Sequence, residues 1–150
     1  MEPGHGERIS LDFETIEKGD SSHYDHYKPL GEPRLFKIES QEELENFWTK
    51  HTDGRRPTPK VPEIDFEKEV VVAVIDVTEP SGYYSIEIEC LEESEKYVIV
   101  KVIKISPNHH NCITTGALTQ PYHIIKTARN SKPFLRSQTD LINDECIPDL

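Results

Sequence analysis

The residues best suited to chemistry lie in the stretch Pro107–His123, PNHHNCITTGALTQPYH. His109, His110 and Cys112 stand close together there, and His123 begins the following run of apolar residues. Imidazole and thiolate groups are common zinc ligands, and a Cys beside a His can also act as a nucleophile. No second Cys stands at a CxxC spacing and no carboxylate is placed to orient a His. We therefore predict no catalytic residue and no cofactor, and we keep these four residues as the candidates for a zinc site.

A second group of polar residues lies in the loop-like stretch EKGDSSHYDHYKPLGEP. Asp20, His23, Asp25 and His26 stand together there. Their spacing matches no zinc motif, and His and Asp are common on polar loops. We interpret this stretch as an irregular loop.

The elements that must position these loops are read from the stretch between Val70 and Pro107. Three runs rich in β-branched and aromatic residues, separated by turn-like gaps, predict a three-stranded antiparallel meander. The run Val70–Val77 is apolar on nearly every residue, which indicates a strand covered on both faces. The first turn passes Pro80 into Gly82, where glycine permits a positive φ.

The pattern also predicts a register for the second hairpin. With Glu92–Lys96 as its loop, the apolar residues of the two strands face one another on one side of the sheet. The same register places Glu87 opposite Lys101 on the other side. The predicted core pairs are Cys90 with Val98, Ile88 with Val100, and Ile86 with Val102.

One helix is predicted, at Gln41–His51. Ser40 and Glu43 form a capping box, and Leu44, Phe47 and Trp48 recur at the spacing of one helical face. Its apolar stripe is the candidate to cover the open side of the sheet. We further predict short strands at 9–16, 35–38 and 122–125, an extended basic connector at 52–62, and an irregular C-terminal tail at 127–150. The fold class is thus α+β: a β-dominated antiparallel sheet or sandwich with one principal helix.

Composition narrows the partners. The 150 residues suit a single domain, 1–150, and carry a net charge of -11 with no long acidic run. Nucleic-acid binding requires clustered Lys and Arg, so we expect no nucleic-acid partner. No apolar run is long enough to span a bilayer, and the first ten residues lack the apolar segment of a secretory signal. As written, the chain is expected to be cytoplasmic, or extracytoplasmic if it is a trimmed mature domain.

The order of motifs resembles the C-terminal domain of the PrcB family of protease-complex subunits. The motifs are EKGDSS, LENFWTKH, DFEKEVVVAV, SGYYSIEI, ISPNHHNC and LTQPYHIIK, and the resemblance covers about 11–126. It implies an auxiliary, non-catalytic subunit associated with a serine protease. The function predicted on this basis is an accessory domain that binds a protein or peptide, with a protease as the implied partner.

The segment EPSGYY is also similar to a loop of chagasin-like cysteine protease inhibitors. Those immunoglobulin-like proteins use a second, Arg-Pro-aromatic loop, and the nearest text here is Lys132-Pro133-Phe134. An immunoglobulin-like inhibitor that uses the Gly82 turn is therefore an alternative to the accessory role, and a zinc-binding protein that uses the His109–Cys112 loop is another.

If the chain binds a partner, we expect two loops at one end of the sheet to make the contact. One precedes the strand that starts near Gly82, and the other follows the adjacent strand. The predicted partner-binding residues are Ser81, Gly82, Tyr83, Tyr84, Asn108, His109, His110, Thr114 and Thr115.

Overall fold

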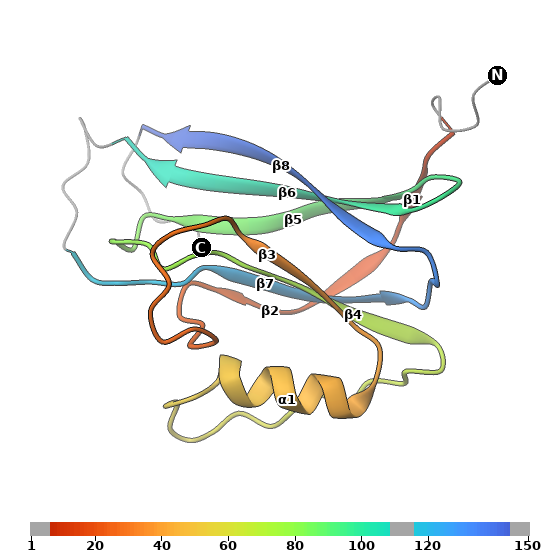
Figure 1. Ribbon diagram of the computed structural model, residues 1–150, viewed down its shortest axis with the longest axis horizontal. Helices are drawn as coiled ribbons and strands as arrows, with labels where there is room; N and C mark the ends of the chain where they lie inside the picture. The colour runs from red at the N-terminus through yellow and green to blue at the C-terminus, as the bar shows by residue number, and fades with distance from the viewer. Residues whose placement is uncertain (1–6, 109–115, 145–150) are drawn as a thin grey trace.

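The computed structural model describes residues 7–108 and 116–144, which form eight strands and one helix (Figure 1). The fold is α+β and β-dominated, as predicted. The elements are β1 (Ile9–Leu11), β2 (Phe13–Gly19), β3 (Arg34–Ile38), α1 (Gln41–His51), β4 (Glu69–Ile75), β5 (Ser85–Glu93), β6 (Val98–Pro107), β7 (Tyr122–Ala128) and β8 (Phe134–Asn143).

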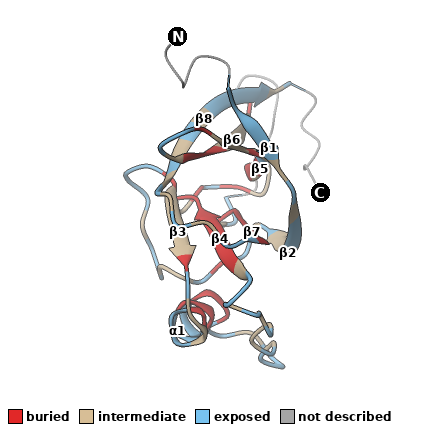
Figure 2. Cartoon of the chain, turned by 90° about the vertical axis from the view of Figure 1, so that its right-hand side faces the viewer, coloured by how far each residue is buried: buried red, intermediate tan, exposed pale blue. Residues whose placement is uncertain are grey.

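The strands make two four-stranded sheets. Sheet A has the order β1-β5-β6-β8 and sheet B the order β2-β7-β4-β3. All pairings are antiparallel except that of β6 with β8, which is parallel. Helix α1 lies along the face of sheet B that points away from sheet A, so the molecule has three layers (Figures 1 and 2).

Strand β4 is buried on both faces, as its continuous apolar sequence predicts. Val71, Ala73 and Ile75 face the helix layer, where they belong to one core cluster. Val72 and Val74 face sheet A, where they belong to a second cluster with residues of β5 and β6. Two separate cores therefore meet on this one strand.

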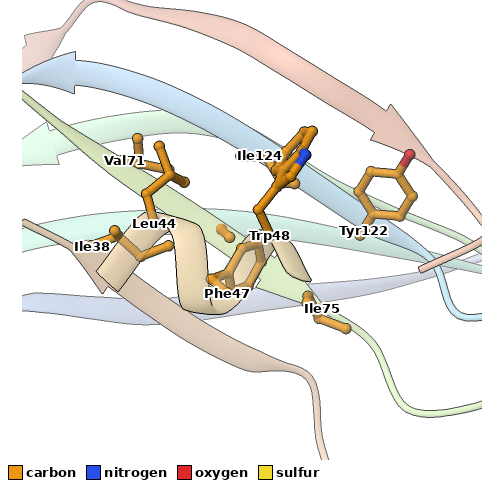
Figure 3. Close-up of a cluster of buried hydrophobic side chains, with 9 residues drawn as sticks. Ile38, Leu44, Phe47, Trp48, Val71, Ile75, Tyr122 and Ile124 are labelled. Carbon is orange, nitrogen blue, oxygen red and sulfur yellow. The ribbon is translucent and has the colours of Figure 1, made fainter. Parts of the chain in front are cut away.

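Helix α1 begins and packs as its sequence predicts. The Ser40 side chain accepts a hydrogen bond from Glu43 N at 3.2 Å, and Glu39 N donates one to the Glu43 carboxylate at 2.9 Å. Leu44, Phe47 and Trp48 are buried against sheet B. Figure 3 shows these side chains among residues of β4 and β7.

The predicted meander is wrong at its first step. β5 and β6 form the expected hairpin, but β4 belongs to sheet B and pairs with β3 and β7. The residues that link β4 to β5, 76–84, instead cross from one sheet to the other. A strand that is apolar on both faces fits this place, since it must lie between two layers. Gly82 does not use a positive φ, so that expectation is wrong as well.

The predicted register of the second hairpin is also wrong. The strands are joined by a shorter turn at 94–97, and β5 carries a bulge between Ile88 and Cys90. The bulge changes which residues face inward, so that Leu91 is fully buried and Cys90 is only half-buried. Leu91 therefore takes the core place predicted for Cys90. Lys101 forms an ion pair with Glu92, at 3.3 Å, in place of the expected Glu87.

The prediction of an irregular C-terminal tail at 127–150 is wrong, because residues 134–143 form strand β8. β8 runs beside β6 over ten residues without a register shift. Its sequence, FLRSQTDLIN, is mostly polar because it lies at an edge of sheet A and buries little. The short first strand is likewise divided, since β1 pairs in sheet A and β2 in sheet B.

The bulge in β5 predicts that substitutions at Leu91 and Cys90 have different effects on stability. Leu91→Ala should lower the free energy of unfolding by about 2–5 kcal/mol, because it removes a fully buried side chain from the core between the sheets. Cys90→Ala should cost less than about 1 kcal/mol, because the thiol is half-buried on the bulge. Urea unfolding of both variants measures the difference, and a larger loss for Cys90→Ala would contradict the register.

Candidate functional site

Three segments far apart in the sequence meet at one end of the two sheets, and we call them together the loop end. They are residues 20–33, 76–84 and 116–121, all at the left of Figure 1. Glu79 and Thr119 join two of them through a pair of backbone hydrogen bonds of 2.8 and 2.9 Å. The Thr119 hydroxyl also donates to Ser81 O at 2.7 Å. Hydrogen bonds between loops therefore hold this end together.

The segment 20–33 is tied to both of the others. Ser22 N donates to Gln120 O at 3.1 Å, and Thr78 N donates to Lys28 O at 2.7 Å. Lys28 N returns a hydrogen bond to the Thr78 hydroxyl at 2.8 Å. Because these hydrogen bonds tie all three segments to one another, the loop end presents a defined surface.

A pocket of about 350 Å³ opens among the three segments. Its lining residues carry hydroxyl, imidazole, amide and carboxylate groups, and Leu118 is the one apolar residue among them. The lining residues are Ser21, Ser22, His23, Asp25, His26, Thr78, Leu118, Thr119 and Gln120.

Exposed apolar side chains gather at this end. Leu118 is 63% exposed, and Tyr27 and Leu30 are 64% and 81% exposed. Tyr27 lies between His26 of the pocket wall and Lys28, whose backbone is bonded to Thr78 of the same wall. Three large apolar groups on one set of loops favour contact with another molecule, since single exposed residues are usually scattered.

Below the pocket lies a buried histidine network. His51, at the end of α1, is fully buried, and its Nε2–H donates to the Glu17 carboxylate at 2.7 Å. Its Nδ1 accepts from the Ser22 hydroxyl at 2.8 Å. Arg55 donates two hydrogen bonds to the same Glu17 carboxylate, at 3.0 and 3.1 Å. The helix end, β2 and the loop at 22 are thus joined through one imidazole ring.

The charge states of this network follow from its surroundings. Burial lowers the pKa of His51 more than Glu17 raises it, so the ring is neutral. Burial alone would raise the pKa of Glu17, but hydrogen bonds from His51, Arg55 and Tyr122 lower it to about 2. Burial raises the pKa of Tyr122 to about 12. The network therefore holds one paired carboxylate–guanidinium charge and a neutral histidine.

Ser22, His51 and Glu17 have the order of a nucleophile, a base and an orienting carboxylate. Acyl transfer would also need free amide donors near the hydroxyl to stabilise an oxyanion. The three amides around Ser22 are already engaged: Ser22 N with Gln120 O, His23 N with His51 O, and Tyr24 N with the Ser22 hydroxyl. This arrangement is suited to holding the loop on the helix.

A second buried polar group, which we call the Asp76 cluster, consists of Asp76, Glu79 and Lys104. Lys104 Nζ lies 3.0 Å from Asp76 Oδ1 and 2.6 Å from Glu79 Oε2. Asp76 Oδ2 and Glu79 Oε2 are buried without an aligned hydrogen bond, although the latter is within ion-pair distance of the lysine. Two carboxyl groups therefore share one ammonium group beneath the turn at 80–83.

The Asp76 cluster holds an extra proton. Burial, and then the neighbouring Glu79, raise the pKa of Asp76 to about 7. Burial alone would lower the pKa of Lys104, but hydrogen bonding to Glu79 and the charge of Asp76 raise it. Burial also raises the pKa of Tyr84, which borders the cluster. Near neutral pH the Asp76 carboxyl group, which lies under the loop end, therefore gains or loses a proton.

The predicted partner-binding residues lie partly at this end. Ser81 and Tyr84 are buried, and Gly82 and Tyr83 are half-buried on the turn before β5. Asn108, at the end of β6, lies at the same end of sheet A, because the start of β5 pairs with the end of β6. His109, His110, Cys112, Thr114 and Thr115 lie outside the described residues.

His123 is not available as a metal ligand, contrary to its place among the zinc candidates. Its Nδ1 accepts from Ile88 N and its Nε2–H donates to the Thr15 hydroxyl, both at 2.8 Å. Burial lowers its pKa to about 4, so the ring is neutral. His123 therefore links β7 of sheet B to the bulged strand of sheet A. Among residues 7–108 and 116–144, no three His, Cys, Asp or Glu side chains form a metal-binding group.

The loops required by the inhibitor alternative lie at opposite ends of the molecule. Gly82 precedes β5, whereas Lys132 donates to Ser94 O, in the turn that follows β5, at 2.8 Å. The nine residues of β5 separate the two loops by about 30 Å. The two loops do not form one edge for a protease cleft, so this resemblance is not supported.

Sequence reasoning missed the two buried polar groups. His51 was predicted only as the last residue of the helix, and Ser22 only as part of a polar loop. Asp76 carried a usable signal, since it is the single charged residue within the apolar run Val70–Val77. Lys104 likewise stands between two apolar residues, Ile103 and Ile105, of β6. Their meeting depends on the crossing of the chain between sheets, which the predicted meander did not contain.

Comparison with protein families gives one finding. The model of the PrcB C-terminal family matches residues 70–128, which contain β4 to β7 apart from one residue. The resemblance expected over about 11–126 is confirmed for this part of the chain. No match was found among curated proteins or among solved structures. No helix within the described residues is long and apolar enough to cross a membrane.

The Asp76 cluster predicts a dependence of stability on pH. The folded chain keeps the Asp76 proton up to its raised pKa of about 7, whereas the ordinary value is 3.8. The unfolded chain therefore binds fewer protons between these values, and this group's contribution to stability falls as pH rises from about 4 to 7. Asp76→Asn should remove that contribution. The variant should be more stable than the natural chain at pH 8 and show a smaller difference at pH 5.

Urea unfolding of both proteins at the two pH values measures this effect, and subtraction removes the titration of other groups. Lys104→Gln is the matched control. It should lower the free energy of unfolding by about 3 kcal/mol at pH 8, because it leaves two buried carboxyl groups without their cation. An Asp76→Asn variant that is equally destabilised at both pH values would show that Asp76 is not protonated in the folded chain.

Proposed function

We propose that this chain, which matches the PrcB C-terminal family over residues 70–128, is a non-catalytic accessory module of a protease complex. In this proposal the loop end holds a segment of the protease. The observation that carries it is the exposure of Tyr27, Leu30 and Leu118 on loops that are bonded to one another and that enclose a pocket, of which Leu118 is a lining residue.

The chemistry of the loop end favours a polypeptide ligand. The exposed apolar side chains of these loops suit burial of one or two apolar side chains of a partner, while hydroxyl and amide groups in the pocket wall suit hydrogen bonds to its backbone. The pocket wall contains no Lys or Arg and only one carboxylate, Asp25, which is paired with Arg34. A small charged ligand would find no unpaired opposite charge in this wall.

The non-catalytic part of the proposal is supported by the His51 network. The amides around Ser22 are engaged, and the hydroxyl itself is buried. An enzyme would require converging groups that are free to meet a substrate. The network instead stiffens the base of the loop end, which favours binding because less freedom is lost when a partner docks.

The proposal predicts a loss of partner capture from a single exposed residue. Leu118→Asp should reduce capture of a serine protease about ten-fold or more, because it puts a charge into the apolar rim. The measurement is affinity capture from the native cell extract, with retained serine proteases detected by a fluorophosphonate probe. The melting temperature should stay nearly unchanged because Leu118 is 63% exposed.

Ile9→Asp is the matched control for that change. Ile9 is 64% exposed and lies on β1, at the opposite edge of sheet A from β8 and outside the loop end. It should capture as much protease as the natural chain. Equal capture by both variants would contradict a role for the loop end, and the absence of any probe-labelled protein would contradict a serine protease as partner.

The turn at 80–83 supplies a separate prediction. Tyr83→Ala should weaken capture while changing the melting temperature little, because Tyr83 is half-buried on the turn. Tyr84→Ala should lower the melting temperature, since Tyr84 is buried beside the Asp76 cluster. A large loss of stability in Tyr83→Ala would show that this side chain supports the fold and not the contact.

A further inference from the structure

The outer edge of β8 is the least protected sheet edge among the described residues. Each sheet has two edge strands: β1 and β8 in sheet A, β2 and β3 in sheet B. β1 has three residues, β3 has five, and β2 is interrupted by a register shift. β8 has ten residues, no register shift and no proline. Natural proteins usually shorten, bulge or block such edges, because an open edge can pair with another strand.

The backbone groups that β8 turns outward can be identified. Pro133 O accepts from Val98 N, and Asn143 O accepts from Asn108 N, so these two odd-numbered carbonyls point toward β6. Successive residues of a strand direct their backbone groups to alternate edges. The even-numbered residues from Phe134 to Ile142 therefore direct theirs to the open edge.

We propose that β8 pairs with β8 of a second copy of this chain, antiparallel about a two-fold axis at Gln138, so that two copies of sheet A become one eight-stranded sheet. The geometry points to this occupant because the sequence of β8 complements itself in that register. Each residue whose backbone N–H and C=O point to the open edge then lies opposite such a residue of the partner, as hydrogen-bonded pairs of an antiparallel ladder require.

Charge complementarity selects the register. With Gln138 opposite the partner's Gln138, Arg136 lies opposite the partner's Asp140, and the same pair repeats on the other side of the axis. A shift of two residues in either direction leaves both charges opposite neutral residues. A shift of four residues places Arg136 opposite the partner's Arg136, or Asp140 opposite the partner's Asp140. Like charges directly opposite one another are unfavourable.

The apolar residues agree with this register. Leu135 and Leu141 are 48% and 47% exposed, and they lie on the same face of β8. In the proposed ladder Leu135 lies opposite the partner's Leu141, so both exposed side chains become covered. On the other face Phe134 lies opposite the partner's Ile142, which is the most exposed apolar residue of the strand.

In the single chain the two charges are already held at this edge. Arg136 donates to the Gln138 side-chain oxygen, and Gln138 Nε2 donates to Asp140 Oδ1 at 2.7 Å. Arg136 also lies 3.7 Å from the Glu32 carboxylate of the same chain. Forming the dimer exchanges these contacts within one chain for contacts between Arg136 of one copy and Asp140 of the other.

The experiment is a charge exchange followed by sedimentation equilibrium. The natural chain should sediment as two copies at high concentration. Arg136→Asp and Asp140→Arg, each alone, should raise the dimer dissociation constant about ten-fold or more, because each creates two pairs of like charges. The double variant should return the constant to near the natural value, because opposite charges face one another again. Ile9→Lys, on the other edge of sheet A, is the control and should dimerise normally.

A second variant tests the ladder itself. Gln138→Pro removes an N–H that faces the open edge, so the monomer keeps its bonds to β6 and its melting temperature. It should be monomeric at every concentration. A natural chain that is monomeric up to millimolar concentration would overturn the proposal. So would a double variant that dimerises no better than the single ones, or a dimer that persists in Gln138→Pro.

Discussion

The structure depends on the burial of β4 on both of its faces. A strand that is apolar at nearly every residue needs a cover on each side, and here α1 covers one side while sheet A covers the other. This requirement explains why the chain leaves sheet B after β4, builds the hairpin β5–β6 in the second sheet, and returns to place β7 beside β4. The same crossings bring three loops together at one end.

Buried polar groups form hydrogen bonds between the layers of the fold, in addition to the apolar contacts of the two cores. His123 connects sheet B to the bulged strand of sheet A, and His51 connects the helix to the loop at Ser22. Both rings are neutral and use both nitrogen atoms, so their burial leaves no polar atom unsatisfied. The Asp76 cluster is different, because it holds two carboxyl groups against one lysine. Because the pKa of Asp76 is raised to about 7, we expect the stability of the loop end to change with pH near neutrality mainly through this cluster.

The sequence was sufficient where local pattern and packing agree. The capping residues and apolar stripe of α1, the two-sided burial of β4 and the hairpin of β5 with β6 all followed from residue spacing. The predicted register was wrong because a bulge shifts the side-chain period of β5 without a local signal in the sequence. At the bulge, Ile88 N donates to His123 Nδ1 of the other sheet, a contact that depends on tertiary structure. β8 was missed because an edge strand that buries little has a polar sequence.

The candidate site was likewise predicted in part. The turn at 80–83 and the end of β6 were predicted to share one end of the sheet, and they do. The contribution of residues 20–33 was not predicted, since the pairing of Ser22 and Lys28 with distant segments depends on tertiary structure. His123 was kept by residue type as a candidate for a zinc site, although its surroundings make it a link between sheets. Residue type suggested chemistry in these cases, and burial and hydrogen bonding decided it.

The most direct test is amide hydrogen exchange of the chain with and without the serine protease proposed as its partner. We expect binding to slow exchange within residues 20–33, 76–84 and 116–121, with little change along α1 and the connector at 52–62. Protection confined to α1, or to the turn at 94–97 at the other end of the sheets, would contradict the assignment of the loop end as the binding surface.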